Sequence, residues 1–529
     1  MSGAAHEATT VVGLLIFMAL CGLLCVMTNA EDDGDDRAAL RDLKPWQHGL
    51  AISGTGLSSV SLLAITGMVA VTGHDGVMML LGMALSMVLL ALVVAEPLRR
   101  TGARTVGDAI TRRASRPSVR VAVALVTLTV CLAFLVLQLA AVGTLTTHML
   151  GLEGTGPRTV GIVVIGGLMA ALAATGGVRG TALVQVVKVG VLLAVFTALA
   201  LFALRHFGWN PDRMLAAAVR GGVHGDALLG SGLQYGSDAL GVLQQIGTAL
   251  VIPLGIACLP HVTLRVLGVG RADRTRPALG WAAGQMLLIS VLLGVAGFGA
   301  AAVVGDRLAG ADASASAVLS LAGALDRGGL LLSAVSCAVF LAALATVADV
   351  VLAGARTVAH DLYAHAVRRG AASPARVSAW ARWTAPAIGM VAVLLAVLAG
   401  DWPLLVLSTV ALTLSASALA PVLLYSLSWP RFTSRGALWC LYGSTVLTLA
   451  LSAASPLLSA GPGAVFPDLD FQLTPLMVPG VVTIPAGFAL GWLGSVLTPN
   501  TSGTHPAAES RATVGTGDRS RTPTDADMR

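Results

Sequence analysis

The chain has 529 residues, of which 56% are hydrophobic and 11% are charged, and its mean hydropathy is +0.83. A soluble globular protein carries about 25% charged residues. This composition therefore excludes a soluble globular protein and predicts a membrane protein with several spans. The formal net charge of +6 comes from arginines in short loops between apolar runs. That pattern sets membrane orientation and gives no reason to expect a nucleic-acid partner.

Apolar segments long enough to cross a bilayer, roughly 17–25 residues each, recur along the chain. The N-terminal segment before the first of them has no Lys or Arg, which argues against a signal peptide and favours a retained helix. The pattern predicts an all-α polytopic membrane protein. Its helices, about thirteen in number by this length criterion, lie near 10–29, 48–72, 76–97, 121–149, 158–176, 182–204, 241–261, 278–304, 330–359, 383–400, 403–427, 437–456 and 475–497.

Arginines gather in loops that are separated by even numbers of predicted spans. The positive-inside rule places these loops on the cytoplasmic side of the cell membrane, with the N-terminus outside and the C-terminus inside. The tail from about Pro499 is rich in Ser, Thr, Pro and charge, which predicts a disordered end. The arginine-rich loops lie near residues 99–116, 265–276, 368–382 and 431–435.

Two predicted helices contain residues that interrupt a helix. They read GLAISGTGLSSVSLLAITG and IPLGIACLPHVTLRVL. Broken helices in corresponding positions of two halves point to the midplane site of a transporter, because freed carbonyls bind cations and half-helix N-termini face anions. Gly and Pro are also common in membrane helices, so the pair of breaks carries more weight than either alone. The interrupting residues are Gly54, Gly56, Pro253, Gly255 and Pro260.

The run LAALATVADVVLAGARTVAHDLY places an aspartate, Asp349, in the middle of a segment suited to lipid. A charged side chain inside the membrane costs free energy, so we expect Asp349 either to pair with a cation or to serve in function. Three interpretations stay open. In the first, Asp349 binds a cation or carries a proton. In the second, it forms a neutral bridge with Lys188 or Arg356. In the third, that internal cation permanently fills the site at the break, and transport is lost or uncoupled.

Thr105 and Asp108 stand at the spacing of a helix N-cap and its third residue, a variant of the capping box. The sequence contains no recognisable nucleophile motif, clustered metal ligands or phosphate-binding glycine loop. We therefore expect no enzymatic activity, and no metal other than a transported cation.

Several stretches resemble a known family. AEPLRRTGARTVGDAITRR is similar to a signature of the sodium:solute symporter family, and WQHGLAISGTGLSSVSLL, GIACLPHVTLRVLGV, ARTVAHDLYA, TSRGAL and FALGWLGSVL resemble its cation/acetate branch. The resemblance implies a LeuT-like fold, with two inverted five-helix repeats preceded by one extra helix and followed by two more. The expected parts are 1–45, a transport core at 46–427, two helices in 428–498 and a tail at 499–529.

The resemblance also implies a function. It is cation-coupled symport, driven by Na⁺ or H⁺, of a short monocarboxylate such as acetate, propionate or pyruvate into the cell. No other cofactor is implied, and the expected partners are the carboxylate, the cation and the lipid bilayer. The alternative is a transporter-fold sensor or a non-transporting subunit with a degenerate cation site.

By motif match, the resemblance places a cation site between the first break and the helix near 330–359. Relatives commonly have two adjacent hydroxyls where this chain has Ala345 and Thr346, so one oxygen donor is missing. Lys188 lies one turn beyond the residue expected to face Asp349, Gln185. The implied cation-site residues are Gly54, Leu57, Ala342, Ala345, Thr346, Asp349 and Gln185.

A small carboxylate needs a few hydrogen-bond donors and an apolar wall. Candidate donors lie at the first break, on the predicted fourth helix, and in free backbone amides at the second break. They are Thr55, Ser58, Ser59, Gln138 and the amides near Gly255.

Overall fold

The computed structural model describes residues 18–19, 21–23, 43–150, 154–175, 177–269, 272–308, 313–326, 328–400, 402–459 and 464–498. The regular elements of this part of the chain are helices. There is also one isolated β-bridge, between Ser459 and Phe466. Most of the predicted first span and the predicted C-terminal tail lie outside the described residues.

Ten helices are long and apolar enough to cross a membrane, and a bent pair makes an eleventh, counting only described residues. This agrees with the predicted all-helical membrane fold. The long spans are α5–η2–α6 (His74–Arg100), α8 (Pro117–Leu150), α9–η3–α10 (Thr155–Thr175), α11 (Val178–His206), α13 (Ala239–Ala257), α15 (Ala272–Val304), α17 (Leu330–Arg356), α18 (Pro374–Ala399), α19–η7–α20 (Leu404–Ser428) and α21 (Ser434–Ala453).

Shorter helices complete the fold. The last predicted span is a shorter apolar helix, α22, which packs against α21. The structure also contains short helices that the apolar pattern did not predict. The shorter elements, with the predicted α22 among them, are α7 (Val106–Thr111), α12 (Pro211–Gly221), η4 (Gly225–Leu229), α14 (Pro260–Gly268), η5 (Gly305–Arg307), α16 (Ala313–Leu325), η6 (Thr357–Val367) and α22 (Gly480–Val496).

The first predicted break is confirmed. Helix α3 (Pro45–Gly56) ends where Leu57 adopts an extended conformation, with φ −92° and ψ 121°. The chain becomes helical again in η1 (Ser61–Ile65) and α4 (Thr66–Thr72), at an angle of 74° to α3. Glycine is a poor helix former, so Gly54 and Gly56 weaken the last turn of α3. Carbonyls at this end are therefore free to bind other partners.

The second break lies later than expected. Helix α13 continues through Pro253 and ends at Ala257, and α14 begins at Pro260. Proline is well suited to the first position of a helix, because its missing N–H would have had no partner there. Pro260 therefore starts a new helix, whereas Pro253 is tolerated inside α13.

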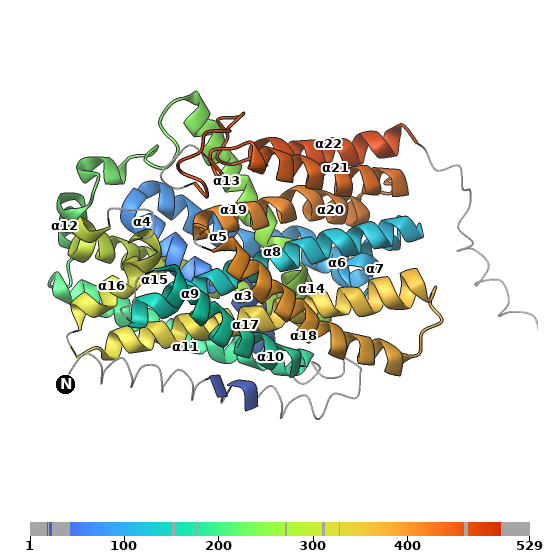
Figure 1. The fold of residues 1–529 in the computed structure, drawn as a ribbon, viewed down its shortest axis with the longest axis horizontal. Coiled ribbons are helices and arrows are strands. Elements are labelled where there is room, and N and C mark those ends of the chain that lie inside the picture. The colour runs from blue at the N-terminus through green and yellow to red at the C-terminus, as the bar shows by residue number, and fades with distance from the viewer. Residues whose placement is uncertain are drawn as a thin grey trace, which may run out of the picture.

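The long helices pack side by side, with α3 against α11 and α15, and α17 against α8, α10 and α11. In Figure 1, α7 and the end of α20 lie at one end of the bundle, and α12 lies at the other. The loop near 99–116 and the one near 431–435 thus share an end, as their arginine content predicts.

Candidate functional site

Asp349 forms an ion pair inside the protein, and its partner is Arg265. Asp349 lies on α17 and Arg265 on α14, and their side chains are 2% and 5% exposed. The guanidinium contacts both carboxylate oxygens, with Nε 3.4 Å from Oδ2 and a terminal nitrogen bonded to Oδ1. Such a forked pair is the strongest geometry that Arg and a carboxylate can form.

This partner differs from the sequence-based interpretation, which proposed Lys188 or Arg356 and assigned Arg265 to a cytoplasmic loop. The structure instead places Arg265 within α14, after the second break. Its guanidinium also donates to the Val178 carbonyl at 2.9 Å and to the Thr181 hydroxyl at 2.6 Å. These bonds fix the guanidinium in place, so Arg265 belongs to the site and not to the charge pattern that sets orientation.

Two neutral side chains complete the surroundings of Asp349. Gln185, on α11, donates from Nε2 to Asp349 Oδ2 at 2.8 Å, so it faces the aspartate as the sequence placed it. The Thr55 hydroxyl lies 2.9 Å from the same oxygen. Buried charges are stable only when paired and hydrogen-bonded, and these contacts satisfy that condition for Asp349.

The ammonium group of Lys188 lies at the first break. Lys188 is fully buried on α11, and its Nζ donates to the carbonyls of Gly54 at 2.6 Å and Leu57 at 2.9 Å. These are the two carbonyls that the resemblance assigns to the cation. A tethered positive charge therefore occupies the end of α3, where the unpaired carbonyls of a helix C-terminus favour a cation.

The predicted ligands on α17 make hydrogen bonds within the protein. The Thr346 hydroxyl donates to the Ala342 carbonyl at 2.8 Å and lies 3.4 Å from the Leu57 carbonyl. The Ala345 carbonyl accepts from Gln185 at 3.1 Å. The predicted cation-site residues of α17 thus do lie beside the first break, and Lys188 stands among them.

Gly54 allows α3 and α11 to approach closely. A Cβ atom at this position would lie 2.9 Å from Val189 Cγ2 and 3.0 Å from Gln185 Oε1. We expect Gly54→Ala to lower the free energy of unfolding by about 1–3 kcal/mol, as overpacking of a filled core does. Thermal unfolding in detergent measures this loss. Gly190→Ala is the matched control, because a Cβ at Gly190 would meet nothing within 4 Å; equal losses in both variants would contradict the expectation.

An apolar cavity of about 60 Å³ lies next to the first break. Most of its wall is apolar, and several hydroxyl groups also line it. Of the predicted substrate residues, Ser58 lines this cavity, whereas Thr55, Ser59, Gln138 and Gly255 are not part of its wall. The polar side chains of the wall are Ser58, Ser61, Tyr235, Thr248, Ser408 and Thr409.

Tyr235 is a lining residue that the sequence analysis missed. Its phenol oxygen accepts hydrogen bonds from Gln234 Nε2 and from the Thr248 hydroxyl, each at 2.9 Å. Burial raises the pKa of Tyr235 to about 12, so the phenol is protonated at physiological pH. Because it already accepts two hydrogen bonds, its own hydrogen is available for another acceptor.

The remaining substrate candidates bond to the protein itself. The Ser59 hydroxyl donates to Gln138 Oε1 at 2.7 Å. Gly255 lies inside α13, two residues before its end, and its carbonyl accepts from Ser415 at 2.9 Å. The expected free amides near Gly255 are therefore a wrong prediction, because the helix continues past this residue.

Comparison with known proteins decides the family. A family model described as "Sodium:solute symporter family" matches residues 38–443. The chain belongs to this family. It is therefore a multi-pass membrane transporter that moves a solute together with a cation, as the sequence motifs implied.

Two relatives of this symporter align over most of their length. It is 33% identical over 465 residues to a "Monocarboxylic acid transporter" of Corynebacterium glutamicum, covering 85% of this chain and 84% of the relative. It is 32% identical over 494 residues to the "Uncharacterized symporter YwcA" of Bacillus subtilis, covering 91% and 94%.

The fold of the symporter is similar to that of a Na⁺-coupled sialic acid symporter solved in a substrate-bound, outward-open state. The TM-score is 0.71 at 14% identity, and the match covers 93% of this chain and 98% of that one. This likeness supports the predicted fold class, and at such low identity it says nothing about the substrate.

Proposed function

We propose that this symporter imports a short monocarboxylate together with a proton, and that Lys188 takes the place of a sodium ion. The observation that carries the proposal is the bonding of Lys188 Nζ to the carbonyls of Gly54 and Leu57. A sodium ion needs several oxygen ligands, and these two carbonyls are engaged by a covalently tethered cation. A tethered ammonium cannot cross the membrane, but its proton can.

The charges of the site support a proton as the coupling ion. Asp349 and Arg265 neutralise each other, so Lys188 leaves one positive charge in excess. That charge balances a bound monocarboxylate, which carries one negative charge. Loss of the proton from Lys188 on the cytoplasmic side would remove this balance and release the carbonyls of α3, which favours departure of the anion.

The cavity beside the first break supports a small carboxylate as the solute. Its volume of about 60 Å³ suits a molecule of a few heavy atoms, and its apolar wall suits a short alkyl chain. Tyr235 supplies a hydrogen-bond donor to this cavity, and Ser58 and Ser61 supply hydroxyl groups. The name of the Corynebacterium glutamicum relative, a monocarboxylic acid transporter, points in the same direction.

Uptake into vesicles tests the function directly. Labelled acetate, propionate and pyruvate are offered with a pH gradient alone, a sodium gradient alone, or neither. We expect accumulation that follows the pH gradient and is the same in sodium and in choline chloride. Accumulation that requires sodium would overturn proton coupling. No accumulation under either gradient would favour the interpretation in which Lys188 fills the site permanently.

Replacing Tyr235 by phenylalanine removes one hydrogen and keeps the ring. We expect KM for the monocarboxylate to rise about 10-fold or more, since a hydrogen bond to a charged group is worth about 1.5–3 kcal/mol. Initial uptake rates against substrate concentration measure the change. Tyr442→Phe is the control, because Tyr442 lies exposed on α21. An unchanged KM in Tyr235→Phe would remove this residue from the substrate site.

A further inference from the structure

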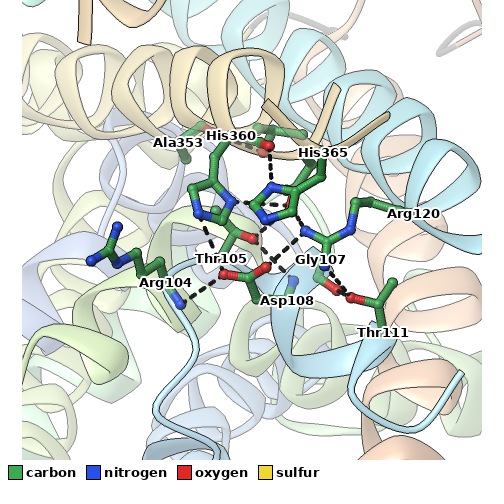
Figure 2. Close-up of polar contacts among 11 residues, drawn as sticks. Arg104, Thr105, Gly107, Asp108, Thr111, Arg120, Ala353, His360 and His365 are labelled. Carbon is green, nitrogen blue, oxygen red and sulfur yellow. Dashed lines mark hydrogen bonds and ion pairs between the residues drawn. The ribbon is translucent and has the colours of Figure 1, made fainter. Parts of the chain in front are cut away.

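Two histidines and an aspartate meet at the end of the α17 span, away from the transport site. Asp108 lies on α7, and His360 and His365 lie on η6, which continues α17. Figure 2 shows the three side chains turned toward one another across the gap between these elements. One ligand atom from each can be chosen so that all three lie within 4.8 Å of one another. They border an open pocket of about 430 Å³.

The histidine spacing fits the local backbone. The segment η6 is a π-helix, in which hydrogen bonds join residues five apart. His360 and His365 are five apart, so this wide turn places their rings on one side, with centroids 4.6 Å apart. In an α-helix the same spacing would point them in different directions.

The tautomer of His365 is fixed by its hydrogen bond. His365 Nδ1 lies 2.8 Å from the carbonyl oxygen of His360, and a carbonyl can only accept, so Nδ1 carries the hydrogen. Nε2 of the neutral ring then has a free lone pair. Metal-binding histidines in proteins are oriented in this way, by donating from the other nitrogen to a carbonyl or carboxylate.

Hydrogen bonds orient the Asp108 carboxylate so that one of its oxygens faces the histidines. Arg120 donates to Oδ1 at 2.7 Å, while Oδ2 lies 3.6 Å from His360 Nε2. Thr105 caps α7 by accepting from the Asp108 N–H at 3.0 Å, which confirms the predicted cap. The reciprocal bond differs from a capping box, because Oδ2 accepts from the Arg104 N–H at 3.3 Å.

The charges around the cluster determine what must accompany a metal ion there. Asp361 is buried next to the cluster, with Oδ1 3.6 Å from His360 Nδ1, and Arg120 contacts Asp108 at 2.7 Å and Asp361 at 3.2 Å. Arg120 thus offsets one of the two carboxylates, which leaves one carboxylate charge among these three side chains. Arg104 and Arg112 also line the pocket, so the three arginines and two aspartates together carry a net charge of +1. An anion or hydroxide would therefore accompany the metal ion and complete its coordination.

From this geometry we propose that Asp108, His360 and His365 bind a divalent metal ion of the zinc class. Two imidazole nitrogens and one carboxylate oxygen suit Zn²⁺, with a fourth position open to solvent. The ion would link α7 to η6, two elements that lie far apart in the sequence. The site is independent of the proposed substrate and coupling ion, and it departs from our expectation of no further metal.

Metal binding to the purified full-length chain in detergent tests the site. Isothermal titration with ZnCl₂ in chloride buffer should give one ion per chain, with Kd of about 1 µM or lower. Co²⁺ should give the visible absorption of a four-coordinate N/O site. Each of His360→Ala, His365→Ala and Asp108→Asn should weaken binding at least about 10-fold. His224→Ala, which changes an exposed histidine elsewhere, should bind as the unchanged chain does.

Several results would overturn the proposal. One is no Zn²⁺ binding and no Co²⁺ band from the unchanged chain, which needs no variant to interpret. Another is binding that survives in His365→Ala, and a third is binding of inorganic phosphate without Zn²⁺, which would make the pocket an anion site. Gel filtration of each variant identifies any that fails to fold. If the variants fail, Zn²⁺ and Co²⁺ binding to the unchanged chain alone tests the proposal.

Discussion

Replacing Arg265 by glutamine is expected to lower the free energy of unfolding by about 3–5 kcal/mol. The change leaves the Asp349 carboxylate 2% exposed and without its forked partner. The contacts from Gln185 and Thr55 remain, but a neutral donor cannot balance a buried charge. Chemical or thermal unfolding in detergent measures the loss, and uptake should fail at temperatures where the unchanged chain still transports.

The double variant Arg265→Gln/Asp349→Asn separates an unpaired charge from lost packing. Without the carboxylate there is no buried charge to balance, so we expect it to recover more than half of the stability that Arg265→Gln loses. Arg276→Gln, an exposed arginine near the start of α15, is the control and should stay within about 0.5 kcal/mol. A double variant as unstable as Arg265→Gln alone would refute the role of the ion pair.

The fold was predictable because a bilayer imposes strict rules on sequence. Backbone groups in lipid must be bonded within helices, so each span is an apolar run of characteristic length. The break after Gly56 was visible for the same reason, since glycines and serines interrupt such a run. The exact position of the second break was not visible in the sequence. Pro253 and Pro260 are equally strong helix breakers, yet Pro253 lies inside α13 and Pro260 starts α14.

The partner of Asp349 could not be read from helix periodicity. Residues three and four apart on one helix share a face, which related Asp349 to Thr346 and Arg356. Arg265 reaches Asp349 from another element, and its place near other arginines made it look like a loop residue. One signal was present: the run TLRVLGV surrounds Arg265 with apolar residues, as a buried position requires.

The metal cluster was hidden for a related reason. Asp108 and His360 lie far apart in the chain, and His360 and His365 have a spacing that only a π-helical turn makes useful. A sequence gives no clear sign of such a turn. The place of Lys188 was easier to anticipate. One of the three open interpretations put an internal cation in the expected site, and Lys188 bonds to two of the carbonyls expected there.

Replacing Lys188 by alanine is expected to abolish uptake driven by a pH gradient, with a loss of at least about 100-fold, since the group that carries the proton is gone. The same change frees the carbonyls of Gly54 and Leu57 and leaves room between α3 and α17. Sodium should then bind where it does not bind the unchanged chain. Thermal unfolding in NaCl against choline chloride detects this, and sodium at ten times its Kd stabilises by about 1.4 kcal/mol.

The two readouts of Lys188→Ala separate coupling from structure. If Lys188 only filled space, the variant would lose stability in both salts and would keep its dependence on the pH gradient. If it carries the proton, the variant loses that dependence and gains one on sodium. Lys44→Ala is the control, because Lys44 is an exposed residue before α3 and should alter neither property. The unchanged chain and the Lys188→Ala variant would then both hold one positive charge beside the broken helix. In the unchanged chain this charge is the proton on Lys188, and in the variant it is a bound sodium ion.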